Sequence, residues 1–93
     1  MLLGMIRRTI HFSGTVQGVG FRYTARAAAK HYPVTGYVRN LPDGRVELVA
    51  EGDASAIDQL VADIHRQMEG YVKKTTGFDS EPTREFKEFS IRH

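Results

Sequence analysis

The order of hydrophobic periodicities along the 93 residues restricts the fold more than any other feature of this sequence. Apolar residues alternate with polar ones where a strand has one covered face, and they recur at helical spacing where a helix has one. Alternation predicts strands at residues 6–13, 34–39, 45–51 and 89–91, and helical spacing predicts helices at residues 21–32 and 57–68. The predicted order is therefore strand, helix, strand, strand, helix, strand.

This order predicts an α+β fold of the ferredoxin-like βαββαβ type, an antiparallel sheet with both helices on one face, because crossovers are right-handed. A single domain is expected over residues 1–93, with residues 1–5 as a frayed N-terminal extension. The first two strands of such a sheet run in the same direction. The loop at residues 15–21 and Asn40, at the end of the second strand, should therefore meet at one end of the sheet.

The region after the second helix is harder to assign. Asp53 is a good N-cap for that helix and Gly70 a good C-cap. Tyr71-Val72 and Phe78 could belong to a short fourth strand. The polar stretch at residues 73–84 contains glycine and proline and is typical of a loop, in which the basic residues serve solubility. These basic residues are Lys73, Lys74 and Arg84.

Residues 14–22, Gly-Thr-Val-Gln-Gly-Val-Gly-Phe-Arg, are the strongest functional signal. Gly18 and Gly20 allow backbone angles that a β-carbon forbids, so several N–H groups can point into one concavity at a helix start. Arg22 adds a fork of donors matched to paired oxygens. This combination favours capture of a small tetrahedral anion such as phosphate. It matches neither the Walker loop nor the dinucleotide fingerprint, whose third glycine position is Tyr23 here.

Asn40 is the second candidate, because a neutral amide can donate and accept hydrogen bonds at once. Beside a bound phosphate it could hold a water molecule in line for attack. Each candidate alone has an ordinary structural explanation. The glycine loop could be a simple strand-to-helix turn with a solvated arginine, and Asn40 precedes a hairpin turn at residues 41–44 where asparagine is common.

Together the two segments resemble the acylphosphatase family. Residues 14–22 resemble its first signature, and Gly36-Tyr37-Val38-Arg39-Asn40, with the glycines and the valine that follow it, resembles its second. The resemblance covers residues 6–68 and the last strand. It departs at residues 68–74, where many members carry a segment with proline and valine. The residues it implies for phosphate binding are Val16, Gln17, Gly18, Val19, Gly20, Phe21 and Arg22.

The resemblance implies hydrolysis of an acyl phosphate to a carboxylate and inorganic phosphate. Arg22 and the loop amides would bind the phosphoryl group, and Asn40 would orient the attacking water. The carboxylate leaving group has a conjugate-acid pKa of roughly 4 to 5 and departs without a general acid. Phosphoryl transfer of this kind needs mainly positioning and charge stabilisation, so no metal or other cofactor is expected.

The composition excludes several kinds of site and partner. The absence of cysteine excludes a disulfide framework, a thiol nucleophile and thiolate metal sites. The formal net charge is +2 and the basic residues are scattered, which suits a small anion better than nucleic acid. No segment has the length of a membrane span, and the N-terminus lacks the pattern of a signal peptide. We expect a cytoplasmic monomer without a membrane or nucleic-acid partner.

The other polar residues suggest no second site. The four histidines, at positions 11, 31, 65 and 93, share no metal-ligand spacing. Among the acidic residues, Asp43, Glu47 and Glu51 have the positions of turn and solvated-face residues.

An RNA-binding module is the main alternative from another class, since ferredoxin-like sheets can stack bases on exposed aromatic residues. The exposed rows expected on the first and third strands argue against it, because they contain no aromatic residue and two glutamates. They are Arg7, Thr9, His11, Ser13, Arg45, Glu47, Val49 and Glu51. An anion sensor, or an acylphosphatase-like module working with a larger carbamoyl-transfer protein, stays open. The motifs do not identify the physiological acyl group.

Overall fold

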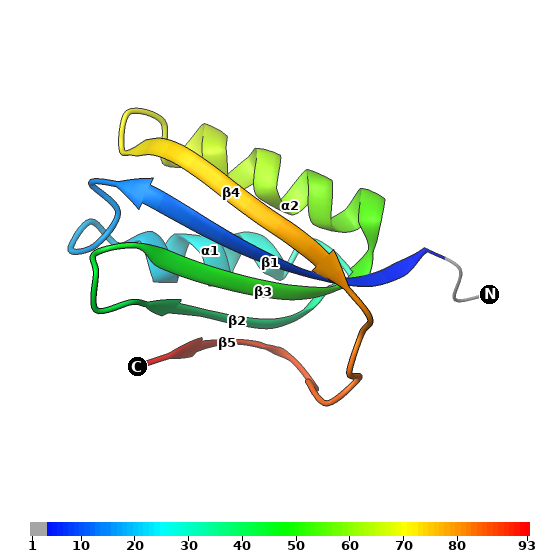
Figure 1. Ribbon diagram of the computed structural model, residues 1–93. Helices are drawn as coiled ribbons and strands as arrows, with labels where there is room; N and C mark the ends of the chain where they lie inside the picture. The colour runs from blue at the N-terminus through cyan, green and yellow to red at the C-terminus, as the bar shows by residue number, and fades with distance from the viewer. Residues whose placement is uncertain (1–3) are drawn as a thin grey trace.

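A computed structural model describes residues 4–93 of the chain. Two helices cover one face of a five-stranded sheet with the order β4-β1-β3-β2-β5 (Figure 1). The β2–β5 pair is parallel and the other pairs are antiparallel. The predicted fold class is confirmed, with a fifth strand that makes the sheet mixed. The elements are β1 (Met5–Gly14), α1 (Phe21–Ala29), β2 (Thr35–Asn40), β3 (Val46–Asp53), α2 (Ala54–Gln67), β4 (Val72–Ser80) and β5 (Phe89–Arg92).

The start of the chain is more ordered than the sequence predicts. Of the expected frayed extension, residues 1–3 lie outside the described residues. Gly4 and Met5 are tied to the fold instead: the carbonyl of Gly4 accepts a hydrogen bond from the amide of Ala54, and Met5 pairs with Asp53 across the sheet. The side chain of Asp53 precedes α2 as expected but makes no capping hydrogen bond.

β4 contains Val72 and Phe78, as the suggested fourth strand did, and it corrects the expected loop for residues 73–80. It is a nine-residue edge strand whose residues 73–80 are all exposed, so no apolar alternation marks it in the sequence. Gly77 pairs with Ile10 of β1, and a β-carbon at Gly77 would lie 2.8 Å from the carbonyl oxygen of Thr9. Gly77 therefore lets β4 approach β1 closely and does not form a turn.

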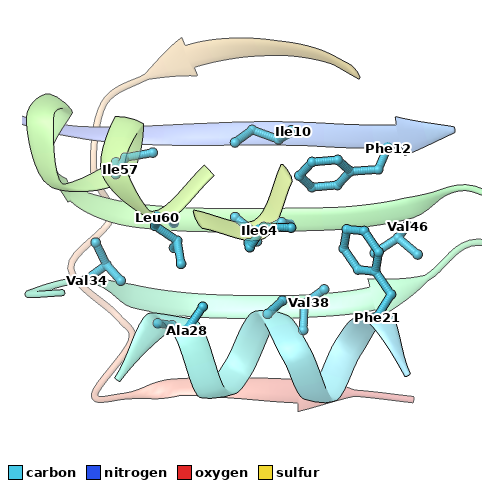
Figure 2. Close-up of a cluster of buried hydrophobic side chains, with 14 of the residues drawn as sticks. Ile10, Phe12, Phe21, Ala28, Val34, Val38, Val46, Ile57, Leu60 and Ile64 are labelled. Carbon is cyan, nitrogen blue, oxygen red and sulfur yellow. The ribbon is translucent and has the colours of Figure 1, made fainter. Parts of the chain in front are cut away.

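The core lies between the helices and the sheet (Figure 2). Phe12, near the end of β1, and Phe21, the first residue of α1, are both buried, and their ring centroids are 4.9 Å apart. Burial of two such large side chains contributes several kcal/mol by its apolar area. The chain between them is thus anchored to the core at both ends. Thr15, within this segment, is held as well, because its amide donates to the carbonyl of Tyr71.

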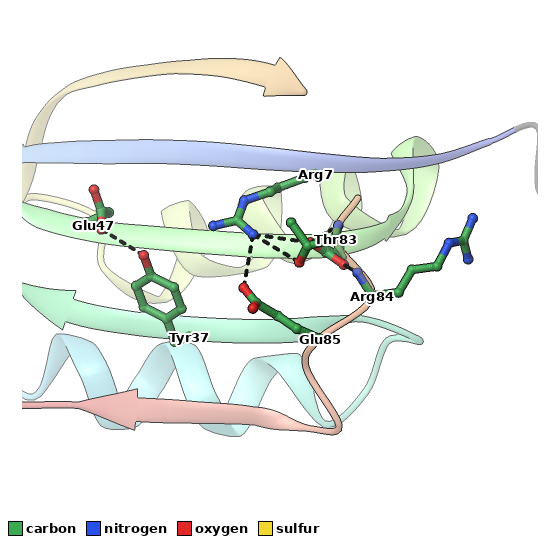
Figure 3. A network of polar contacts seen from close by, with 7 residues as sticks. Arg7, Tyr37, Glu47, Thr83, Arg84 and Glu85 are labelled. Atoms are coloured by element: carbon green, nitrogen blue, oxygen red, sulfur yellow. Dashed lines mark hydrogen bonds and ion pairs between the residues drawn. The ribbon is translucent and has the colours of Figure 1, made fainter. Parts of the chain in front are cut away.

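The opposite face of the sheet is not the solvated surface that the sequence suggests, because residues 81–88 cross part of it (Figure 3). Glu51 of β3 is only 2% exposed. Its carboxylate accepts hydrogen bonds from the amides of Thr83 and Arg84, each at 2.9 Å, and Arg7 lies at 3.4 Å. Burial raises the pKa of Glu51, but these hydrogen bonds and Arg7 outweigh it, so the pKa is lowered. The prediction of a solvated Glu51 was wrong, whereas Arg84, which gives only its backbone amide to Glu51, is exposed.

Glu47 repeats this arrangement nearer the other end of β3. Its carboxylate contacts Arg39 at 2.8 Å, His11 at 2.9 Å and the hydroxyl of Tyr37 at 3.1 Å, so it too is engaged rather than solvated. Tyr37 is 7% exposed and its ring packs against Phe86. This face therefore holds aromatic residues that the rows of the first and third strands did not include, but they cover one another and Tyr37 is not open to solvent.

Candidate active site

The glycine loop, residues 15–20 between β1 and α1, meets the end of β2 as predicted. Figure 1 places this loop, the β2–β3 hairpin and the end of β5 at the same end of the molecule. A cavity of about 110 Å³ lies there, with Asn40 on its wall. Its lining residues are Val16, Gly18, Gly20, Phe21, Arg22, Tyr23 and Asn40. The structure thus brings together most of the residues singled out in the sequence. Of that set, Gln17 and Val19 do not line the cavity.

The backbone of the glycine loop depends on two left-handed residues. Gly18 has a φ of 78° and Gly20, the N-cap of α1, has a φ of 77°. A β-carbon at either position would meet no atom within 4 Å, so conformation and not space requires glycine there. The amides of residues 16–20 donate to no acceptor among residues 4–93. These donors are therefore available to an anion at the start of α1.

The side chain of Gln17 has a role that the sequence did not reveal. Its Nε2 donates to the carbonyl oxygen of Leu41 at 2.8 Å and to that of Arg45 at 3.0 Å. These bonds tie the glycine loop to the β2–β3 hairpin and fix it relative to Asn40. Nε2 of Gln17 is therefore not available to a ligand. The side chains of Val16 and Phe21 are buried in the core, so these residues can offer a ligand only their backbone.

Arg22 supplies the positive charge of the cavity. No carboxylate among residues 4–93 lies within 4.0 Å of its guanidinium. Instead, its Nη1 lies 3.2 Å from Nδ1 of His93 and 3.5 Å from the carbonyl oxygen of Arg92. Sequence reasoning missed these last two residues. The final strand could have indicated them, because a strand parallel to β2 must terminate at the same end of the sheet as Asn40.

Asn40 is half-buried and its side chain has no hydrogen-bond partner among the described residues. An amide in this position can accept a hydrogen bond from water and donate one to a phosphoryl oxygen at the same time. The cavity therefore combines free backbone donors, an arginine with no acidic partner and a free amide. That set can bind a small oxyanion and position one polar molecule beside it.

A second, larger cavity of about 430 Å³ lies between α2, β1 and β4, but it does not have this chemistry. Its arginine, Arg8, is already paired with Asp79 at 2.7 Å and with Asp58 at 2.5 Å. With one cation and two carboxylates, this cavity disfavours an anion. In the part of the chain described, no three His, Asp or Glu side chains gather where they could hold a metal ion. Within residues 4–93, no helix is both long and apolar enough to cross a bilayer.

The chain is similar in sequence and in structure to acylphosphatases. The acylphosphatase family model matches residues 8–91. An acylphosphatase of Methylococcus capsulatus is 46% identical over 90 residues, which cover 94% of this chain and 96% of that protein. The crystal structure of acylphosphatase from Bacillus subtilis superposes with a TM-score of 0.86 at 32% identity, over 95% of this chain and 99% of that one. The fold also matches 12% of the T. kodakarensis HypF structure, with a TM-score of 0.81, 27% identity and 95% of this chain covered.

Proposed function

Because this chain belongs to the acylphosphatase family, an enzyme family that hydrolyses acyl phosphates, we propose that the cavity between the glycine loop and Asn40 carries out this reaction. The observation that supports it most is the set of amides at residues 16–20 that lack a protein acceptor, placed beside an arginine without a carboxylate partner. Such a site can bind the phosphoryl group of the substrate through its non-bridging oxygens.

In this mechanism Arg22 and the loop amides hold the phosphoryl group in the ground state and in the transition state. The charge of Arg22 and the partial positive charges of the amides attract the equatorial oxygens of phosphorus. The N-terminus of α1 adds to this positive potential. The first turn of α1 contains no acidic residue that would weaken this field. We propose that this fixed positive potential replaces a metal ion.

Asn40 then orients the water that attacks phosphorus. A bond forms between the water oxygen and phosphorus while the bond from phosphorus to the acyl oxygen breaks. The electron pair of that bond leaves with the carboxylate, and the water proton passes to the phosphate or to solvent. The carboxylate is a weak base with a conjugate-acid pKa of roughly 4 to 5, so no acid residue has to protonate it. Holding the reactants in line is the main requirement.

Two variants separate these roles with acetyl phosphate as substrate. Arg22→Gln should raise KM, weaken inhibition by inorganic phosphate and lower kcat, because the guanidinium acts in both states. Asn40→Ala should lower kcat about a hundredfold or more while leaving phosphate inhibition nearly unchanged. Near-normal turnover by Asn40→Ala would overturn the role of Asn40 and leave it a hairpin residue.

The metal-free mechanism has its own test. Activity of the wild-type protein should survive exhaustive dialysis against a chelator, with the same kcat before and after. Loss of activity that one divalent ion restores would show that the positive field of Arg22 and the loop is insufficient.

A further inference from the structure

We propose that the flank between α1 and β5 selects acyl phosphates whose acyl part carries a second anionic group, a carboxylate or a phosphate. This inference rests on the function proposed above, since it concerns the part of the substrate beyond the phosphoryl group. It draws on a row of basic side chains, on the groove that they line and on the contact that joins this groove to the phosphate cavity.

The basic row consists of Arg22, Arg26 and Lys30. They follow one another at intervals of four residues and so lie along one side of α1 and its C-cap. Residues 21–30 contain no acidic residue. With a rise of about 1.5 Å per residue, Arg26 lies about 6 Å and Lys30 about 12 Å beyond Arg22 along the helix axis. The first spacing matches the distance from a phosphoryl group to the far end of a four-carbon acyl chain, and Lys30 lies about one helical turn beyond it.

A groove of about 380 Å³ lies on this same flank. Its lining residues are Arg26, Lys30, Glu88, Phe89 and Ser90. β5 begins at the groove and ends at Arg92, whose carbonyl oxygen faces Arg22. The same two elements, α1 and β5, thus border the groove and the arginine of the phosphate cavity.

Tyr23 joins the groove to the cavity. It lines the phosphate cavity and is 63% exposed, and the guanidinium of Arg26 lies 5.3 Å from the centre of its ring. Arg26 in turn lines the groove. A substrate held by its phosphoryl group can therefore extend past Tyr23 toward Arg26 without crossing the core.

The charge of the groove is also suited to an anion. Neither Arg26 nor Lys30 has a carboxylate within 4.0 Å among residues 4–93, whereas Arg7, Arg8 and Arg45 are each paired with one. Glu88 is the acidic residue of the lining, and the two cations exceed its charge. A carboxylate or phosphate on the acyl chain would add the missing partner. Its attraction would be the same in ground and transition states, so it should act on KM.

The test compares butyryl phosphate with succinyl phosphate, which have the same chain length and differ in the distal carboxylate. The ratio of their kcat/KM values should favour succinyl phosphate in the wild type. The double variant Arg26→Gln/Lys30→Gln should lower this ratio about fivefold, the size expected for loss of a solvent-exposed ion pair, through KM of succinyl phosphate alone. A matched control, Lys73→Gln/Lys74→Gln, removes two charges from β4 at the other edge of the sheet and should leave the ratio unchanged.

Two further measurements complete the test. The preference should decrease as ionic strength rises, because salt screens exposed charges. A third substrate, 3-phosphonopropionyl phosphate, shows whether a distal phosphorus group is preferred to a distal carboxylate. An unchanged ratio in the double variant would overturn the inference and leave the proposed function intact. No hydrolysis of butyryl phosphate by the wild type would overturn the proposed function itself.

Discussion

Two polar regions of this molecule differ in whether their hydrogen-bonding groups have partners within the chain. Under residues 81–88, the carboxylate of Glu51 is almost fully buried and both of its oxygens accept hydrogen bonds from the chain. In the glycine loop, the amides of residues 16–20 have no acceptor among the described residues, and Arg22 has no carboxylate partner. Glu51 lies on the central strand β3, whereas the glycine loop lies at one end of the sheet.

The comparison indicates what each region is for. A buried group whose partners belong to the chain contributes to the free energy of folding. A donor without a partner in the chain contributes little to folding and is available to a ligand. Substitutions in the first region should therefore lower stability, and substitutions in the second should alter ligand binding and activity.

The largest expected effect is on stability, in the variant Glu51→Gln. The amide group would place a donor where Thr83 and Arg7 also donate, so the free energy of unfolding should fall by about 3 kcal/mol. Urea denaturation measures this loss, and kcat of the folded protein should stay at the wild-type value. The control Glu81→Gln, at an exposed position, should change stability by less than about 0.5 kcal/mol. Equal losses in the two variants would contradict the comparison.

Inorganic phosphate should produce an effect of similar size and opposite sign. A ligand that binds only the folded glycine loop stabilises it by about 2.7 kcal/mol at a hundredfold excess over its Kd. The gain should appear undiminished in Glu51→Gln and should be much smaller in Arg22→Gln, as measured by thermal unfolding with and without phosphate. A wild-type melting temperature that does not respond to phosphate would show that the loop amides do not bind this anion.

Gly20→Ala should have a smaller effect on stability and a separate effect on activity. Its φ of 77° is left-handed, and forcing an L-residue into that conformation costs about 1–2 kcal/mol. Gly70→Ala is a matched control, because Gly70 has a φ of 90° and equally free surroundings but does not line the phosphate cavity. The two variants should lose similar stability, and only Gly20→Ala should lose turnover. Full activity in Gly20→Ala would remove the loop backbone from the mechanism.

The smallest expected effect is a change with pH. Hydrogen bonds and Arg7 lower the pKa of Glu51 in the folded state below the ordinary glutamate value of 4.5. Its contribution to stability is therefore complete above that pH and is lost as the pH falls through the folded-state pKa. The difference in stability between the wild type and Glu51→Gln should shrink in acid, as followed by urea denaturation at several pH values. A difference that grows in acid would reverse the sign of this linkage.

Much of the fold and of the candidate site followed from local patterns in the sequence. Phe12 and Phe21 fit the alternating and helical periodicities because each element buries one face, and burial of one face leaves a periodic trace. The topology alone predicted that the loop, Arg22 and Asn40 lie together, because β1 and β2 run in the same direction and terminate at the same end of the sheet. β4 left no such trace because, at the edge of the sheet, its residues 73–80 are exposed.

The sequence by itself determined the order of the elements, the conformation that Gly18 and Gly20 permit and the donors that Arg22 and Asn40 offer, because these depend on residue type and close neighbours. Only the tertiary structure decided which polar groups are satisfied. Gln17 finds its acceptors 24 and 28 residues away, and Glu51 finds its donors 32 and 33 residues away. Such partners are set by how the whole chain packs, so the same polar residue type becomes a structural support in one place and a free ligand group in another.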